Sequence, residues 1–129
     1  MDFFEGAAAS ASGLKAQAQR LRLVSENIAN ADTPGYRRKV ASFEQVMTAG
    51  QPSGEVTTGK VQLDPREGGT VHDPSHPMAD AAGNYVGSNV DLVVEIADAR
   101  EAQRSYEANL KLFDQARQMS KGLLDLLRR

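Results

Sequence analysis

The chain of 129 residues has no cysteine and no tryptophan, and it has few aromatic residues of any kind. Without cysteine it can form neither disulfides nor thiolate metal sites, and a cysteine nucleophile is excluded as well. The absence of cysteine does not indicate the cellular compartment, because a chain without thiols is compatible with both reducing and oxidising compartments. Aromatic residues make up only 5% of the chain, so its core must be built from smaller aliphatic side chains.

Long apolar runs are also absent. No stretch of about 18 consecutive apolar residues occurs, so the sequence predicts no membrane-spanning helix. Residues 1–5, MDFFE, carry acidic side chains where a secretory signal carries Lys or Arg. We therefore expect no export by the general secretory route.

The charges are balanced and spread along the chain, with 15 basic and 17 acidic residues and a formal net charge of −2. Binding to nucleic acid requires clustered Lys and Arg, so the sequence predicts no nucleic-acid partner. Most charged side chains are expected on solvated helix faces. The length suits one domain rather than two independent cores.

Residues 2–31 carry the pattern of a long amphipathic helix. Asp2 and Glu5 have the spacing of a capping box at its beginning. A Thr-Pro-Gly sequence at residues 33–35 ends the helix, because Pro disfavours helical backbone in the residue before it. Apolar or small residues alternate at three- and four-residue spacing, which is a heptad stripe: Phe4, Ala7, Ala11, Leu14, Ala18, Leu21, Ser25 and Ile28.

A second helical pattern runs from about residue 89 to the end of the chain. Asn89 is the expected N-cap, and Asp91 and Glu95 lie near the positive end of the helix dipole. Two neighbouring apolar stripes follow: Ile96, Ala99, Tyr106, Leu110 and Phe113 in one, and Leu112, Ala116, Met119, Leu123 and Leu126 in the other. Pairing with one helix covers only one stripe, so we expect other subunits to cover the second.

Residues 37–88 differ from both ends and contain most of the Gly and Pro. Short alternating segments at residues 61–63, 70–72 and 84–86 predict brief strands, separated by Gly-containing turns. The sequence therefore predicts a mainly α fold within one domain. Long N- and C-terminal amphipathic helices (residues 1–36 and 89–129) pair as a coiled-coil-like core, and residues 37–88 form a small β and loop segment.

Two histidines suggest a metal site only superficially. His72 and His76 are four residues apart, but Pro74 and Pro77 break the helix that would place both on one face. No third ligand is evident, so the sequence predicts no metal site and no cofactor.

No catalytic motif is evident either. The sequence contains no Gly-rich phosphate-binding loop, and its Ser, His and Asp residues show no recognisable nucleophile context. Asp91, Glu95 and Asp98 are explained as carboxylates at a solvated helix start. We therefore predict that the chain is not an enzyme and has no catalytic residues.

Residues 25–36, SENIANADTPGY, resemble the S-x-N-x-A-N-x-x-T-P-G-Y signature of bacterial flagellar rod and hook proteins. Residues 71–86 and 89–109 are similar to the middle and last helix of proximal rod members of that family, whose length also fits. The matching positions of the signature are Asn27, Ala29, Asn30, Thr33, Pro34, Gly35 and Tyr36.

The resemblance implies a subunit of the periplasmic rod of the flagellar basal body, exported unfolded through the flagellar type III apparatus. Its terminal helices would form a tube-like core around the export channel, and the rod would transmit torque. The implied partners are copies of itself, other proximal rod proteins, the rod-to-ring adaptor and the distal rod. Asn27, Asn30 and Tyr36 would fix the end of the first helix.

The expected assembly interface lies on both helices, within one subunit or between neighbours. It comprises Leu14, Leu21 and Ile28 on the first helix and Ile96, Tyr106, Leu110, Phe113 and Leu123 on the second.

On periodicity alone, a monomeric α+β protein-binding domain is an equally good interpretation. A small hydrolase related to peptidoglycan-cleaving rod factors is a further alternative, disfavoured because no acid or metal constellation supports it.

Overall fold

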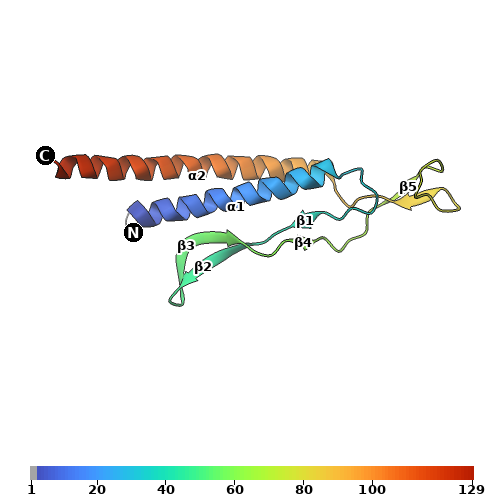
Figure 1. The fold of residues 1–129 in the computed structure, drawn as a ribbon, viewed down its shortest axis with the longest axis horizontal. Helices are drawn as coiled ribbons and strands as arrows, with labels where there is room; N and C mark the ends of the chain where they lie inside the picture. Colours follow the sequence, from blue (N-terminus) through green and yellow to red (C-terminus); the bar gives the residue numbers. More distant parts are fainter. Residues whose placement is uncertain (1–2) are drawn as a thin grey trace.

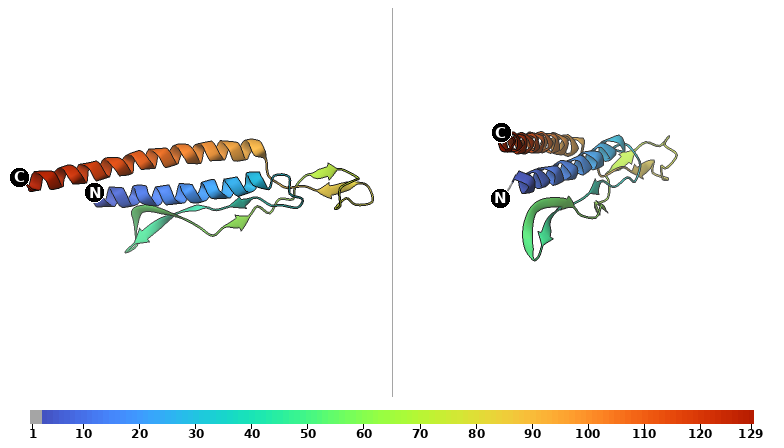
Figure 2. Two further views of the ribbon diagram at one scale, coloured as in Figure 1. Left: turned by 45° about the horizontal axis from the view of Figure 1, so that its top comes forward. Right: turned by 60° about the vertical axis from the view of Figure 1, so that its left-hand side comes forward.

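The structure, a computed structural model, describes residues 3–129 as an elongated body built on two long antiparallel helices (Figure 1). Helix α1 spans Phe3–Ala29 and helix α2 spans Leu92–Leu127. They pack side by side along α1, and the last turns of α2 extend beyond the beginning of α1 (Figures 1 and 2). Within residues 3–129, neither helix is apolar enough over a sufficient length to cross a membrane.

The helix bounds lie close to the predicted ones, but the cap of α2 differs. Asp91 is the N-cap, and its side chain accepts a hydrogen bond from the Val93 N–H at 3.0 Å. The prediction of Asn89 as the cap is wrong because its side chain is engaged by residues outside α2. Asp2, the expected cap of α1, lies outside the described residues.

Six short strands within residues 3–129 form three two-stranded antiparallel sheets, which pair β1 with β4, β2 with β3 and β5 with β6. The predicted strand segments at 61–63, 70–72 and 84–86 are confirmed as β4, β5 and β6. The β2–β3 hairpin was missed, because its tight turn contains Ala49, a non-Gly residue with a φ of 51°. The strand bounds are Lys39–Val40 (β1), Phe43–Thr48 (β2), Gln51–Thr58 (β3), Gln62–Leu63 (β4), Thr70–His72 (β5) and Asn84–Val86 (β6).

Helix α1 lies between α2 and the β2–β3 hairpin, which is near the beginning of α1 (Figure 2). Strands β5 and β6 lie beyond the end of α1. The hairpin is attached to α1 through Ser12, whose hydroxyl accepts a hydrogen bond from the Val56 N–H at 3.0 Å. One side of α1 is therefore covered by strands and a second side by α2.

The face between the two helices is built from small and polar residues. Among residues 3–129 the fully buried hydrophobic side chains are Ala16, Leu23, Val24 and Ala102. At Gly13 the helices approach so closely that an added Cβ would lie 2.8 Å from Asn109 Oδ1. Few large apolar side chains are available here to stabilise the pair.

The predicted heptad stripe of α1 is not the stripe that faces α2. Phe4 is 76% exposed and Ile28 is 37% exposed. The buried positions of α1 fall on a neighbouring stripe that includes Ser10, Gly13 and Asn27. Close helix approach favours these small residues, and Asn27 is held there by polar partners described below. The larger apolar side chains of the predicted stripe therefore lie beside the contact with α2.

The chain exposes far more surface than a compact protein of its mass. Its accessible surface is 9139 Å², whereas a compact monomer of this mass, 13.9 kDa, exposes about 6,700 Å². The surplus of roughly 2,400 Å² reflects the elongated shape and the small core.

Candidate functional site

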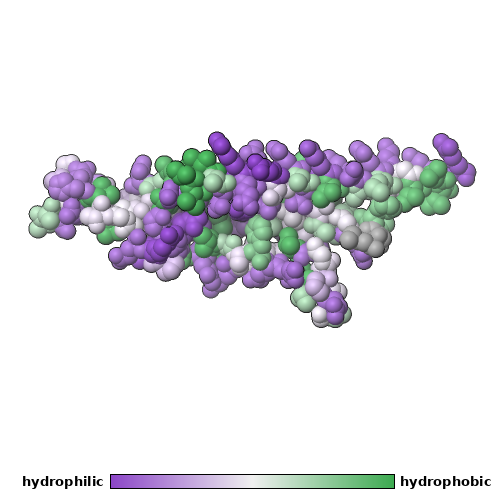
Figure 3. All heavy atoms as spheres, turned by 180° about the vertical axis from the view of Figure 1, so that it is seen from behind, coloured by the Kyte–Doolittle hydropathy of each residue, from purple (hydrophilic) through white to green (hydrophobic). Residues whose placement is uncertain are grey.

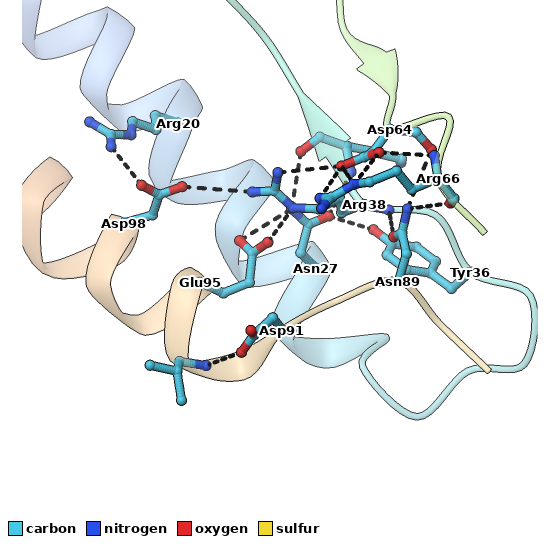
Figure 4. Close-up of polar contacts among 12 residues, drawn as sticks. Arg20, Asn27, Tyr36, Arg38, Asp64, Arg66, Asn89, Asp91, Glu95 and Asp98 are labelled. Atoms are coloured by element: carbon cyan, nitrogen blue, oxygen red, sulfur yellow. Dashed lines mark hydrogen bonds and ion pairs between the residues drawn. The ribbon is translucent and has the colours of Figure 1, made fainter. Parts of the chain in front are cut away.

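A buried polar network joins the end of α1, strand β1 and the beginning of α2 (Figure 4). Its centre is Asn27, whose side chain is almost entirely enclosed at 1% exposure. Asn27 Oδ1 accepts hydrogen bonds from the Tyr36 hydroxyl at 2.9 Å and from the Lys39 N–H at 2.8 Å. Its Nδ2 donates to the Lys39 carbonyl at 3.0 Å. One side chain thus fixes the path of the chain after α1.

Other residues of the signature shape the turn between α1 and β1. Asn30 Nδ2 donates to the Glu26 carbonyl at 2.9 Å, and its Oδ1 accepts from the Thr33 hydroxyl at 3.1 Å. Gly35 has a φ of 70°, a left-handed conformation that favours glycine. Ala29 is the last residue of α1, and Pro34 lies within the turn. The expected hydrogen-bonding roles of Asn27, Asn30 and Tyr36 at the helix end agree with this geometry.

Glu95, on α2, is the fully buried charged residue of the network, with 0% exposure. Arg38 Nε donates to Glu95 Oε1 at 2.6 Å, and Asn27 Nδ2 lies 3.4 Å from Glu95 Oε2. The prediction of a solvated carboxylate is therefore wrong for Glu95. A buried carboxylate requires a cation and hydrogen-bond donors, and Arg38 and Asn27 supply them.

Arg38 also approaches two further carboxylates. Its Nη1 lies 3.8 Å from Asp64 Oδ2, and its Nη2 lies 3.7 Å from Asp98 Oδ2. Asp98 in turn pairs with Arg20 on α1 at 2.9 Å (Figure 4). These ion pairs connect α1, β1 and α2 around a single guanidinium group.

Asp64 and Asn89 attach the segment after β4 to the same network. Hydrogen bonds from Arg66, mainly from its side chain and also from its backbone N–H, hold the pKa of Asp64 well below its usual range. The Asn89 side chain accepts from the Arg38 N–H at 2.7 Å and donates to the Arg66 carbonyl at 2.9 Å. Four segments that are distant in sequence therefore meet at one point.

Two further ionisable groups at the network are perturbed. Burial raises the pKa of the Tyr36 phenol. The side-chain hydrogen bond to Glu26, 3.0 Å long, raises the pKa of Lys39. Both groups therefore keep their protons more firmly than free side chains do.

Sequence reasoning missed Arg38, Asp64, Asn89 and Glu95 as partners of the signature. A signal was present in α2, where Glu95, Ala102 and Asn109 are each seven residues apart. Two of these are buried and the third packs against Gly13. A charged residue in heptad register with small residues indicates a polar helix interface rather than a solvated helix face.

The predicted interface residues fall on different sides of the helix pair. Ile96 and Leu110 are 46% and 41% exposed on the side of α2 away from Asp98 and Arg38. At about 100° per residue, Leu14, Leu21 and Ile28 lie on the matching side of α1, away from the strands. Tyr106 and Phe113 are half-buried between these positions and α1, and Leu123 lies on another side, near the end of α2.

The two histidines lie at the β5–β6 hairpin. The His76 ring stacks on Tyr85 with ring centres 4.0 Å apart, and His72 Nδ1 lies 2.9 Å from Asn84 Oδ1. In the part of the chain that the structure describes, no three potential metal ligands of the His, Cys, Asp or Glu type are grouped together.

Two family models match the chain. Residues 8–37 match the model described as flagella basal body rod protein, and residues 81–126 match the model of the flagellar basal body rod FlgEFG protein C-terminal region. The matches cover the signature with most of α1, and nearly all of α2. Both helices that meet at the polar network are thus typical of rod proteins.

Individual relatives match over nearly the whole chain. Flagellar basal-body rod protein FlgC of Agrobacterium fabrum is 44% identical over 126 residues, covering 91% of this chain and 89% of the relative. FlgC of Salmonella typhimurium is 34% identical over 121 residues, covering 89% and 90%. FlgC of Bacillus subtilis is 33% identical over 146 residues, covering 96% and 95%. On this similarity, the chain belongs to the FlgC family of flagellar basal-body rod proteins.

Proposed function

We propose that this chain polymerises through the exposed apolar sides of its terminal helices, which pack in a coiled-coil-like manner against those of neighbouring subunits. As a member of the FlgC family it is a structural protein of the flagellar basal body and not an enzyme. The interpretation as a monomeric α+β binding domain is not favoured, since the relatives are rod proteins.

The observation that carries the proposal is the surplus of accessible surface. A standard protein interface buries about 800 Å² on each partner. The surplus of roughly 2,400 Å² would therefore match about three such contacts for each subunit. One partner in a closed dimer leaves most of this surface uncovered, whereas a subunit within a tube has neighbours on several sides.

The apolar residues beside the α1–α2 contact supply the surface for these neighbours. Leu14, Leu21 and Ile28 would pack with Ile96 and Leu110 against the terminal helices of adjacent copies. Tyr106 and Phe113 would complete this face, and Leu123 would contact a different neighbour. The polar network keeps α1 and α2 in the register that forms the face.

The finer features of the assembly rest on the family resemblance. The division into residues 1–36, 37–88 and 89–129 would separate the two assembling helices from a middle segment specific to this subunit. The subunit would be exported by the flagellar type III apparatus to the periplasm. There it would contact the other proximal rod proteins, the rod-to-ring adaptor and the distal rod, and transmit torque around the export channel.

Substitution of Leu21 tests the interface directly. Leu21→Asp places a charge in the apolar face, so we expect loss of swimming and of rod assembly with synthesis unchanged. Motility in soft agar and electron microscopy of basal bodies measure the effect in a strain that lacks its own copy. Lys15→Asp, at an exposed polar position of the same helix, is the matched control and should support swimming. Normal swimming of Leu21→Asp cells would refute the interface.

A further inference from the structure

Arg38 is the residue at which α2 and the segment after β4 are held together. Each of its three guanidinium nitrogens faces a different carboxylate (Figure 4): Glu95 Oε1 at 2.6 Å from Nε, Asp64 Oδ2 at 3.8 Å from Nη1, and Asp98 Oδ2 at 3.7 Å from Nη2. Its backbone is engaged as well, because its N–H donates to Asn89 Oδ1 at 2.7 Å and its carbonyl accepts from the Asp64 N–H at 2.9 Å. One residue thus binds α2, the residues before α2 and the segment after β4.

The middle segment, residues 37–88, has little direct contact with α2. The chain joins it to α1 through residues 30–36 and to α2 through residues 89–91. A hydrogen bond from the Asn89 N–H to the Tyr36 carbonyl, 3.1 Å long, pairs these two connections but lies outside α2. The β2–β3 hairpin lies across α1 from α2, and β5 and β6 lie beyond the end of α1 (Figure 2). The contacts of Arg38 with the first turns of α2 therefore fix the angle between this helix and the middle segment.

The turn of α2 that Arg38 holds also carries exposed apolar side chains. Figure 3 shows apolar surface over the beginning of α2 and over its last turns, next to hydrophilic side chains. Val93, Val94 and Ile96 are 77%, 48% and 46% exposed. These residues lie within one helical turn of Glu95. A neighbouring subunit that packs on them would therefore apply force to the same turn of α2 that Arg38 binds from the inner side.

We propose that Arg38 is the positioning residue through which mechanical load passes between α2 and the middle segment. This inference rests on the proposed function, because it names the residue that carries torque across one subunit. Arginine suits this role since its planar guanidinium presents donors in fixed directions, whereas lysine has one compact ammonium group. A buried ion pair adds little net stability over apolar packing but can specify one geometry. The Arg38 side chain is 16% exposed and that of Glu95 is 0% exposed, so their pair is of this buried kind.

Two variants remove these contacts in different ways. Arg38→Lys keeps a cation beside the buried carboxylate of Glu95, but one ammonium group cannot reach three carboxylates at once. Arg38→Met with Glu95→Met replaces both charges of the buried pair by apolar side chains, an exchange that is often neutral or stabilising. Asp64 and Asp98 each keep a second arginine partner in both variants.

Arg37→Lys is the matched control, because it makes the same change at the neighbouring arginine. The Arg37 side chain donates to the Pro65 carbonyl at 3.1 Å in an exposed hydrogen bond. Each variant replaces the chromosomal copy, and electron microscopy counts basal bodies with complete rods. Beads attached to the hook measure rotation, small beads at low torque and large beads at high torque. Urea unfolding of the purified chains measures their stability.

We expect both Arg38 variants to form complete rods and to turn small beads as the parent does, but to lose the rotation of large beads. The double variant should be at least as stable as the parent, so that its loss under load is not a loss of folding. Cells with Arg37→Lys should turn beads of both sizes.

Rotation of large beads at the parental rate by either Arg38 variant would overturn the proposal. So would an absence of rods in both variants, since Arg38 would then be needed to build the rod rather than to carry its load. An equal loss of rotation in Arg37→Lys cells would also overturn it. The proposed function would stand in each of these cases, whereas absence of the unmodified chain from basal bodies would refute the proposed function itself.

Discussion

At the scale of single residues, Asn27 connects the most parts of the network, because its one side-chain amide forms hydrogen bonds with three residues in two segments. It accepts from Tyr36 and from the Lys39 N–H, and it donates to the Lys39 carbonyl and to Glu95 on α2. Asn30 lies in the same turn, but its contacts are confined to the end of α1 and the turn itself. Asn27 is therefore expected to contribute more to the stability of the fold than Asn30.

Asn27→Ala should lower the free energy of unfolding by about 2–4 kcal/mol, because it leaves several buried polar groups unpaired at about 1–3 kcal/mol each. Asn30→Ala should cost about 1 kcal/mol or less, since water can reach its partners. Urea unfolding followed by circular dichroism compares the two. Equal losses would show that the enclosed position of Asn27 has no special role.

Asp64 makes the network sensitive to acid. Its pKa lies below the ordinary value of 3.8 in the folded chain because Arg66 donates hydrogen bonds to the ionised carboxylate. The unfolded chain binds this proton more readily, so Asp64 contributes stability above pH 3.8 that is lost as the pH falls towards its folded pKa.

Asp64→Asn should therefore flatten the loss of stability on acidification. Urea unfolding at neutral pH and at about pH 3 measures the difference for the parent and the variant. The difference in the free energy of unfolding between the parent and the variant should be larger at neutral pH than at low pH. A difference that does not change with pH would contradict the role assigned to the carboxylate.

At the scale of elements, the packing of α1 on α2 depends on the absence of a side chain at Gly13. An added Cβ would lie 2.8 Å from Asn109 Oδ1, whereas at Gly6, on the same helix, an added Cβ meets nothing within 4 Å. The two glycines have the same helix propensity but differ in their surroundings. They therefore separate the effect of propensity from that of packing.

Gly6→Ala should stabilise the chain by up to about 1 kcal/mol through helix propensity alone. Gly13→Ala should instead be neutral or destabilising by about 1–3 kcal/mol, because Asn109 must move. The double variant Gly13→Ala with Asn109→Ala removes the obstruction and should recover stability, as measured by thermal unfolding. A stabilised single Gly13→Ala variant would argue against close packing at this point.

At the scale of the whole molecule, a small core is combined with a large exposed surface. Among residues 3–129, four hydrophobic side chains are buried, whereas large apolar side chains of α2 such as Leu112, Met119 and Leu126 are exposed. A chain with so little internal apolar burial gains much of its stability only when neighbours cover its surface. Folding and assembly are therefore expected to be coupled.

The helical content of the purified chain should accordingly rise with concentration. Association removes folded monomers from the folding equilibrium, so more of the unfolded chain folds. Circular dichroism at 222 nm combined with sedimentation velocity measures both quantities over the same concentration series. Helical content that is full and constant in a dilute monomer would contradict this coupling.

The sequence by itself determined the two long helices, three of the six strands and the signature at the end of α1, because hydrophobic period, turn residues and motifs are local properties. It also identified two apolar stripes on α2 that exceed the needs of one partner. Only the tertiary structure decided that α1 and α2 meet through small and polar residues, with Glu95 buried against Arg38 and Asn27. That outcome depends on residues 57 and 68 positions apart in the chain, a distance over which periodicity carries no information. The apolar stripes were thereby left beside the helix contact, on surfaces available to other subunits.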